Sequence, residues 1–300
     1  VLHPHNGISP VQRTLVTTGK EENVCNIAVK GKFDKGENLV KSMFSDKEFS
    51  NQINMSGVNS INWARIIAQS VYYFYCYFLA EDDNQPINFS VPTGNFGDVY
   101  AGYLAKKLGL PINKLIVATN QNDILHRAIS KGKYEAEHVS ETISPSMDIQ
   151  IASNFERLIY DLNNHDSSQT LDDMKNIKQN GKYTIDVEKL KKINQDFLSA
   201  RISEQETLDV IKNIYEKFNM VLDPHTAIGY GAFDKHDLKG NNIVLATAHP
   251  CKFPDAILKA INLKSDLPDE LKFILDEKEN YGIIENNLKE IKQYILGKIK

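Results

Sequence analysis

The residues best suited to bind an anion form the segment Val91-Pro92-Thr93-Gly94-Asn95-Phe96-Gly97-Asp98, between an apolar run and a helical pattern. Glycine accepts positive φ and lets the backbone approach a ligand closely. Free N–H groups at the start of the following helix would point at the anion along the helix dipole. The spacing indicates a phosphate site, although a tight strand-to-helix connection without a ligand explains it equally well. Asp98 would repel a phosphate, so we expect it to cap the helix.

Two common phosphate loops are absent, since the sequence contains neither GxxxxGK[ST] nor GxGxxG with an acidic partner. ATP and NAD are therefore poor candidates. The 35 basic and 39 acidic residues nearly cancel, which argues against nucleic-acid or membrane partners. The three cysteines form no CxxC pair, so we expect no metal site and a reducing compartment, the cytosol or an organelle matrix, of which we adopt a cytoplasmic location. The most apolar run, residues 71–80, is too short to span a bilayer, which takes about 20 residues.

Short apolar runs alternate with helical spacing around the turn, which predicts an α/β fold with a parallel sheet and helices on its faces. The predicted strands are residues 24–29, 87–91, 114–119 and 242–246, and the predicted helices are 34–44, 60–79, 98–108 and 123–131. Two further stretches, 187–220 and 269–300, have the charge pattern of exposed helices. The polar stretch 163–180 is interpreted as a surface excursion.

The predicted helix 60–79 has apolar residues at three- and four-residue steps, so we expect it to be long and mostly buried. Asn62, Arg65 and Gln69 make a polar stripe along it. A buried Arg65 must meet an anion, which is either a ligand phosphate or carboxylate or an acidic side chain of the protein. Ser60 is either a ligand contact or, as we favour, the N-cap of this helix.

Six ordered motifs together resemble the longer, bacterial and fungal type of threonine synthase. The motifs are Asn59-Ser60-Ile61-Asn62-Trp63-Ala64-Arg65, Pro92 to Asp98, Ala118 to Asp123, Ser144 to Ile149, Ser153 to Arg157 and Thr247-Ala248-His249-Pro250. Including Leu2-His3-Pro4 and Ile8 to Gln12, the resemblance runs to about Ala256. Any one motif alone would be weak, whereas their order makes the resemblance specific.

The resemblance implies a lyase of threonine biosynthesis that uses pyridoxal 5′-phosphate (PLP) and converts O-phospho-L-homoserine and water to L-threonine and phosphate. It implies the fold of fold-type II PLP enzymes, like the tryptophan synthase β-subunit, with open, mostly parallel sheets. By resemblance, Gly94, Asn95, Phe96 and Gly97 wrap the cofactor phosphate and Thr247 meets the pyridine nitrogen. From the residues alone, Thr247 could equally satisfy a backbone group. Ser60, Asn62 and Arg65 are the candidate substrate-binding residues.

The sequence departs from the family because the segment carrying the Schiff-base lysine is expected upstream of Val1. No catalytic residue is therefore assigned in this chain, and we expect the chain alone to be inactive. Residues 1–56 are interpreted as the remnant of a smaller α/β domain and 57–300 as the larger PLP-binding domain with C-terminal helices. The protein is expected to be a monomer or homodimer. Alternatives are a threonine synthase-like phospho-lyase and a non-catalytic phosphate-ligand-binding module.

Overall fold

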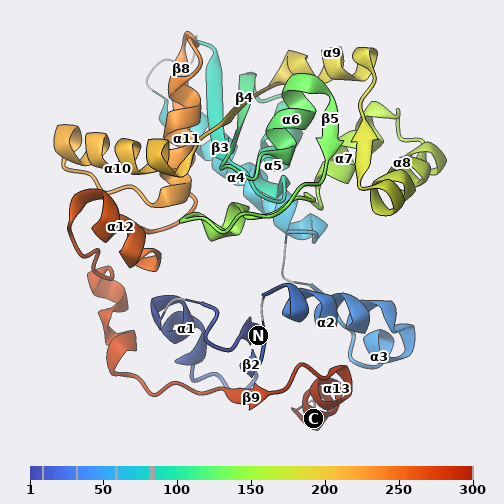
Figure 1. Cartoon of the computed structure of the whole chain (residues 1–300), viewed down its shortest axis with the longest axis vertical. Coiled ribbons are helices and arrows are strands. Elements are labelled where there is room, and N and C mark those ends of the chain that lie inside the picture. The colour runs from blue at the N-terminus through green and yellow to red at the C-terminus, as the bar shows by residue number, and fades with distance from the viewer. Residues whose placement is uncertain (9, 32, 58–59, 81–84, 299–300) are drawn as a thin grey trace. The chain divides into compact units, whose positions relative to one another are not determined.

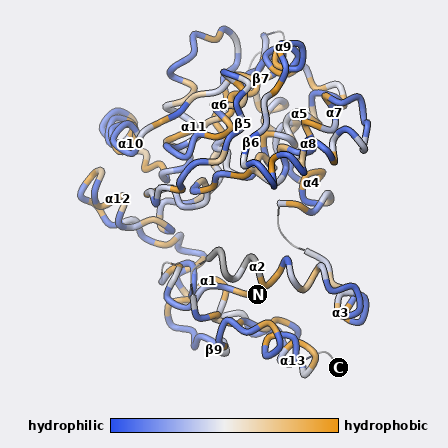
Figure 2. The backbone as a smooth tube through the Cα atoms, turned by 45° about the vertical axis from the view of Figure 1, so that its right-hand side comes forward, coloured by the Kyte–Doolittle hydropathy of each residue, from blue (hydrophilic) through white to orange (hydrophobic). Residues whose placement is uncertain are grey.

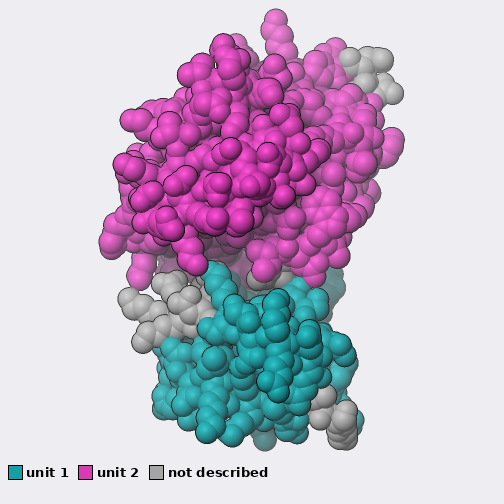
Figure 3. All heavy atoms as spheres, turned by 90° about the vertical axis from the view of Figure 1, so that its right-hand side faces the viewer, with its two compact units in different colours: residues 1–57, 265–300 teal, residues 58–264 magenta. Residues whose placement is uncertain are grey.

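The structure, a computed structural model, describes residues 1–8, 10–31, 33–57, 60–80 and 85–298 (Figure 1). Asn59 of the first family motif and Lys300 at the end of the last predicted helix lie outside the described residues. The chain forms two compact units, which are coloured separately in Figure 3. One consists of residues 1–57 and 265–300, and the other of residues 58–264. They are called the small unit and the large unit below.

The small unit is built on a three-stranded parallel sheet in the order β1-β2-β9. Its elements are β1 (Leu2–Pro4), α1 (Pro10–Thr17), β2 (Ile27–Val29), α2 (Phe33–Ser45), α3 (Lys47–Gln52), the 3-10 helix η3 (Asp269–Asp276), β9 (Gly282–Ile284) and α13 (Leu288–Lys298). Met43 and Ile291 pack over Ile27 and Val29 of the central strand. Strand β9 pairs with β2, and this pairing joins residues 265–300 to the beginning of the chain.

The large unit contains a four-stranded parallel sheet in the order β7-β4-β3-β8. Its strands are β3 (Ile87–Pro92), β4 (Ile112–Thr119), β7 (Phe197–Arg201) and β8 (Asn241–Val244), with a separate antiparallel pair β5 (Lys133–Glu135) and β6 (Lys182–Thr184). Its helices are α4 (Trp63–Leu79), α5 (Gly97–Lys107), α6 (Ile124–Lys131), η1 (Pro145–Met147), α7 (Phe155–Leu162), α8 (Ser167–Asn180), α9 (Val187–Asp196), α10 (Glu204–Phe218), α11 (Pro224–Asp234), η2 (Pro250–Lys252) and α12 (Pro254–Ile261).

Apolar side chains point alternately to the two faces of the sheet along β4, which explains why helices cover both faces. Leu115 and Val117 belong to the larger core, which also contains residues of α4, α5 and α6. Ile116 and Ala118 point to the other face and pack with Ile228 of α11. Since successive side chains of a strand point to opposite faces, an apolar run of this kind is typical of a sheet buried on both sides. The α/β fold with a parallel sheet is confirmed.

Several expected elements are corrected by the structure. The predicted helix 187–220 is interrupted by β7, because Phe197–Arg201 pairs with β4 and Ser203 begins α10 with a capping box to Glu206. The stretch 163–180 is mostly exposed, and within it α8 forms a regular helix that starts at a cap by Asp166 and ends at Gly181 with φ 68°. Within the predicted stretch 269–300, the described residues 269–298 contain η3, β9 and α13 and are not purely helical.

The predicted helix 60–79 begins at Trp63, and the expectation that it is mostly buried is wrong. Only Ile66, Ser70 and Tyr73 of α4 are buried. The domain boundaries expected from the sequence stay a prediction, but the contacts group residues 265–300 with the small unit. None of the helices in the described part of the chain is long and apolar enough to cross a membrane.

Candidate functional site

The candidate site lies at the carboxyl end of β3, where the chain turns into α5. In open parallel sheets, ligands bind beyond the carboxyl ends of the strands. Phe96 holds the turn by adopting a left-handed conformation with φ 63°, and its ring is fully buried against Phe155 and Phe197. The Phe96 side chain is therefore an anchor in the core, so only its backbone can face a ligand.

The backbone of this turn offers a set of N–H donors. Within the part of the chain that the structure describes, no N–H group from Gly94 to Val99 donates a hydrogen bond, whereas the neighbouring N–H of Thr93 is bonded to Ala118 O at 2.8 Å. The first N–H groups of a helix lack partners inside the helix and carry the positive end of its dipole. The chemistry of this donor set fits a phosphate group.

Two glycines permit the close packing around these donors. A Cβ at Gly94 would lie 2.6 Å from the backbone oxygen of Ser146 in η1. A Cβ at Gly97 would lie 3.3 Å from Ser60 Cβ and from Asn154 Nδ2. Ser60 is thus beside the turn, as expected for a site residue, although it does not cap α4. Asn62 is the N-cap instead, since its Oδ1 accepts from Ala64 N at 3.0 Å.

Asn95 is exposed, but its backbone is tied to the loop before α7. Asn95 O accepts hydrogen bonds from Asn154 N and Asn154 Nδ2, both at 3.1 Å. The sequence motifs 144–149 and 153–157 contain Ser146 and Asn154, but neither motif by itself places these residues at the turn. The order of the motifs along the chain carries no distance information, so only the fold reveals these contacts.

Thr247 follows the strand next to β3. The two strands are parallel, with Ser90 opposite Val244 and Leu245 N bonded to Ser90 O at 3.0 Å. Hydrogen-bonded strands lie about 5 Å apart, so the chain leaves both strands at the same edge of the sheet. Thr247 and the turn at Gly94 thus follow the carboxyl ends of adjacent strands, and Thr247 is exposed.

Arg65 is exposed on α4 and not buried, which corrects the premise that it must meet an anion. It acts electrostatically on Asp98, as one of two influences that lower the pKa of that carboxyl group. Burial outweighs both and raises the pKa of Asp98 to about 6. Asp98 does not cap α5, because its Oδ1 and its backbone oxygen accept from the Tyr73 hydroxyl at 3.2 and 2.8 Å.

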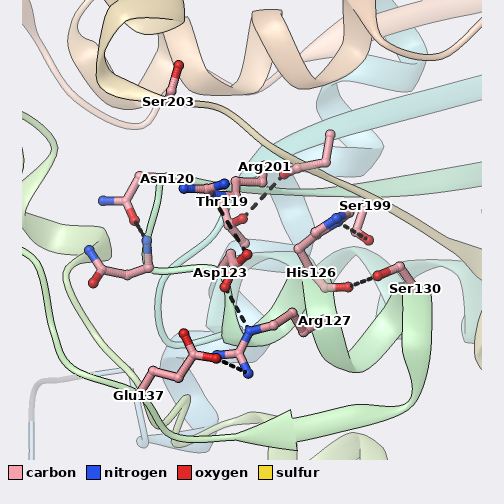
Figure 4. Close-up of polar contacts among 12 residues, drawn as sticks. Thr119, Asn120, Asp123, His126, Arg127, Ser130, Glu137, Ser199, Arg201 and Ser203 are labelled. Carbon is pink, nitrogen blue, oxygen red and sulfur yellow. Dashed lines mark hydrogen bonds and ion pairs between the residues drawn. The ribbon is translucent and has the colours of Figure 1, made fainter.

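A second polar cluster follows the ends of β4 and β7 (Figure 4). Asp123 Oδ1 accepts from Arg127 Nε at 2.8 Å, and Asp123 Oδ2 is 3.7 Å from Arg201 Nε. Arg127 also pairs with Glu137 at 3.1 Å. Because the two carboxylates balance the two guanidinium groups, this cluster holds loops together and leaves no net charge for an anion.

A third cluster supports the loop that touches Gly94. The carboxylate of Asp148 accepts from the amides of Asn120 at 2.8 Å and Asn122 at 3.0 Å, and from Thr142 N at 2.8 Å and Oγ1 at 2.6 Å. Asn120 and Asn122 are buried, so these bonds satisfy donors that would otherwise lose water. The cluster fixes the segment just after η1 and so keeps Ser146 against the turn.

Known proteins match this chain over most of its length. Residues 226–295 match the family model "Threonine synthase, C-terminal". The chain is 40% identical to threonine synthase of Pseudomonas aeruginosa over 98% of its own length, and 44% identical to that of Saccharomyces cerevisiae over 95%. The crystal structure of PLP-bound threonine synthase from Brucella melitensis covers 99% of the chain at a TM-score of 0.94 and 43% identity.

The parallel sheet, the turn at its carboxyl edge and this structural match define the class as the fold-type II PLP enzymes. Within that class, the chain belongs to the threonine synthase family. It spans 64% of the Pseudomonas protein and of the Brucella structure and 61% of the yeast protein.

Proposed function

We propose that the protein to which this chain belongs is a PLP-dependent threonine synthase, which converts O-phospho-L-homoserine and water to L-threonine and phosphate. Phosphate leaves the γ carbon of the substrate, and water adds at the β carbon. The cofactor, when bound, supplies a ring that withdraws electrons from the substrate amino acid. We further propose that the protein acts in the cytoplasm as a monomer or homodimer.

The observation that carries the proposal is the set of backbone N–H groups from Gly94 to Val99, which donate no hydrogen bond to any residue that the structure describes. They lie at the sheet edge where Thr247 follows the adjacent strand. A phosphate dianion satisfies several such donors at once and is favoured by the dipole of α5. In this arrangement Gly94, Asn95, Phe96 and Gly97 hold the cofactor phosphate by backbone groups. The Thr247 hydroxyl meets the pyridine nitrogen without adding a charge.

The substrate side is assigned to the beginning of α4. Ser60 lies against Gly97, and Arg65 is near enough to Asp98 to influence its ionisation. The exposed guanidinium of Arg65 is suited to the substrate phosphate or carboxylate, because its planar fork can donate two parallel hydrogen bonds. Asn62 has a weaker claim, since its side-chain oxygen is used as the helix cap. The lysine that binds the cofactor is expected upstream.

The proposal is tested by joining the unmatched third of the Brucella melitensis enzyme to this chain and measuring the products from phosphohomoserine. Threonine and phosphate should form in equal amounts. A Gly97→Val variant should lose the absorbance of bound PLP, because its side chain would enter the space between Ser60 and Asn154. A Gly36→Ala variant is the control, since among the described residues no atom beyond its chain neighbours and its own helix backbone lies within 4 Å of the added Cβ. Full PLP absorbance in Gly97→Val would refute the assignment of residues 94–97, called the cradle below, to the cofactor phosphate.

A phospho-lyase related to threonine synthase is the second candidate. The chain is 33% identical to "Threonine synthase-like 2" of Xenopus laevis and 32% identical to "Threonine synthase-like 1" of Pongo abelii, below the 40% and 44% for the Pseudomonas and Saccharomyces threonine synthases. Formation of 2-oxobutanoate with phosphate, and no threonine, would favour this candidate. Absence of both products despite bound PLP would favour a non-catalytic phosphate-ligand-binding module.

A further inference from the structure

Helix α4 is fixed to the large unit by one face. Tyr73 is completely buried, and its ring meets Phe89 of β3 edge-on at 4.8 Å between centroids. Its hydroxyl donates to the backbone oxygen of Asp98 in α5 at 2.8 Å. Ile66, one of the three residues buried on the same face, is also fully buried. The helix is therefore an integral part of this core and not a loosely attached arm.

The opposite face of α4 is apolar and exposed. It consists of Trp63, Ile67, Val71, Tyr72, Tyr75, Phe78 and Leu79, called the outer face below. With Ile61, these residues are eight of the 24 exposed large apolar side chains in the described part of the chain. Hydrophilic residues dominate α10 in Figure 2, in contrast to the apolar composition of α4. A helix that is hydrophobic all round is typical of a buried position.

The exposed apolar area of the outer face is larger than that of single hydrophobic residues scattered over a surface. Phe78 is 76% exposed, Tyr75 65% and Tyr72 53%, so these three aromatics alone present on the order of 300–400 Å². The largest apolar patch of a typical monomer is about 300–600 Å² and is often functional. At the first turn of α4, the outer face continues into a cleft of about 1020 Å³ that Trp63, Tyr100 and Leu171 help to line. The outer face and this cleft thus form one continuous surface.

The relatives contain a polypeptide segment that has no counterpart in residues 1–300. The chain superposes on 64% of the Brucella enzyme at a TM-score of 0.94, so about a third of that enzyme has no counterpart in residues 1–300. Because residues 226–295 match the family's C-terminal model, the unmatched third of the relatives lies mainly on the N-terminal side. That polypeptide must pack on a fold almost identical to this one and needs an apolar surface to do so.

We propose that the outer face of α4 is the docking surface for the polypeptide that corresponds to the unmatched N-terminal third of threonine synthases. The inner side of the same helix reaches the cofactor turn, since Ser60 Cβ and Ile66 Cδ1 would lie 3.3 and 3.5 Å from a Cβ at Gly97. Docking therefore places the arriving polypeptide one helix away from the cradle. The docking does not depend on the proposed function. Only its consequence, that the docked polypeptide positions the catalytic lysine, rests on that function.

Hydroxyl-radical footprinting compares the chain alone with the chain joined to the unmatched third of the Brucella enzyme. Oxidation of Tyr72, Tyr75 and Phe78 should fall at least fivefold in the joined protein. Phe218, which is 55% exposed on α10, should react equally in both and serves as the internal control. Unchanged oxidation of Tyr75 and Phe78 in the joined protein would overturn the proposal.

Other occupants give different results in the same experiment. If a second copy covers the outer face, the aromatics are protected in the chain alone, and dilution that dissociates a dimer restores their oxidation. If another part of the same chain covers it, protection in the chain alone is independent of concentration. Either result contradicts the proposal. Production of threonine is assayed separately, so a failure of the proposed function does not affect the footprint.

A substitution supplies an independent measurement. Phe78→Asp should leave the denaturant midpoint of the chain alone unchanged, because the side chain is already in water, and should lower the midpoint of the joined protein. The control Phe218→Asp should have the same effect in both proteins. An equal loss for Phe78→Asp in both proteins would mean that the face is covered without the upstream polypeptide, which refutes the proposal.

Discussion

Replacing Gly94 by alanine tests whether close packing of η1 holds the cofactor turn. The added Cβ would lie 2.6 Å from Ser146 O and 3.4 Å from Met147 Cα, so the backbones must separate by at least a few tenths of an ångström. The backbone around Ser146 and Met147 is held in place by its surroundings. Met147 is buried, its N–H bonds to Ser144 O at 2.9 Å, and Asp148 anchors the residues that follow.

Overpacking of this kind costs about 1–3 kcal/mol. Alanine also restricts the unfolded chain more than glycine does, which offsets about 0.4–1 kcal/mol of the loss. We therefore expect Gly94→Ala to lower the free energy of unfolding by about 1–2 kcal/mol, or the melting temperature by roughly 2–8 °C for a unit of this size. Urea unfolding followed by circular dichroism measures the first quantity and calorimetry the second.

The same shift should weaken PLP binding in the joined protein, because the N–H donors move with the backbone. Gly36→Ala is the matched control. Gly36 lies within α2, and no described atom outside its own helix backbone and chain neighbours lies within 4 Å of the new Cβ, so the substitution should stabilise by about 0.5–1 kcal/mol. If Gly94→Ala raised the urea midpoint as the control does, the packing of Ser146 against Gly94 would not constrain the turn.

Three further predictions concern charges near the site. Burial raises the pKa of Asp98 in the folded protein to about 6. The contribution of Asp98 to the free energy of unfolding is therefore fully present below about pH 4, where the carboxyl group is protonated, and is lost as the pH rises through 6. Asp98→Asn should therefore stabilise by about 1–2 kcal/mol at pH 8 and by nothing at pH 4, which urea unfolding at both pH values checks; an equal gain at both contradicts the shift. Asp148→Ala should lower the free energy of unfolding by about 2–4 kcal/mol because the buried amides of Asn120 and Asn122 lose their acceptor, whereas a loss below 0.5 kcal/mol would show that water replaces it. In the joined protein, Arg65→Ala should reduce phosphohomoserine turnover at least tenfold while the absorbance of PLP persists, and unchanged kinetics remove Arg65 from the site.

Local structure around the turn was readable from the sequence. The glycines at 94 and 97, an apolar run before them and a helical pattern after them predicted the strand, the turn and the helix to within a residue or two. These features depend on backbone conformations and on periodicity, which a short window of sequence contains. The ordered motifs also identified the family, because several short patterns in a fixed order are far more specific than any single one.

What lies beside the turn was decided only by tertiary structure. Asn154 and Ser146 contact the turn from segments more than fifty residues away, and Thr247 follows a strand about 150 residues further along the chain. Parallel pairing brings such distant segments to one edge of the sheet, and no local pattern encodes which strands become neighbours. Strand β7 was missed for the same reason, since its pairing with β4 overrides a helical pattern.

Helix α4 shows the limit most clearly. Its apolar periodicity, an intrinsic property of the sequence, correctly predicted a helix between residues 63 and 79. The same pattern does not state which face meets which neighbour, because burial depends on the whole surrounding chain. The sequence by itself thus determined the strand, the turn and the helix around Gly94 and the helical periodicity of α4. Only the fold decided that one side of α4 supports the turn while the other is left open, since packing joins residues that are distant in the sequence.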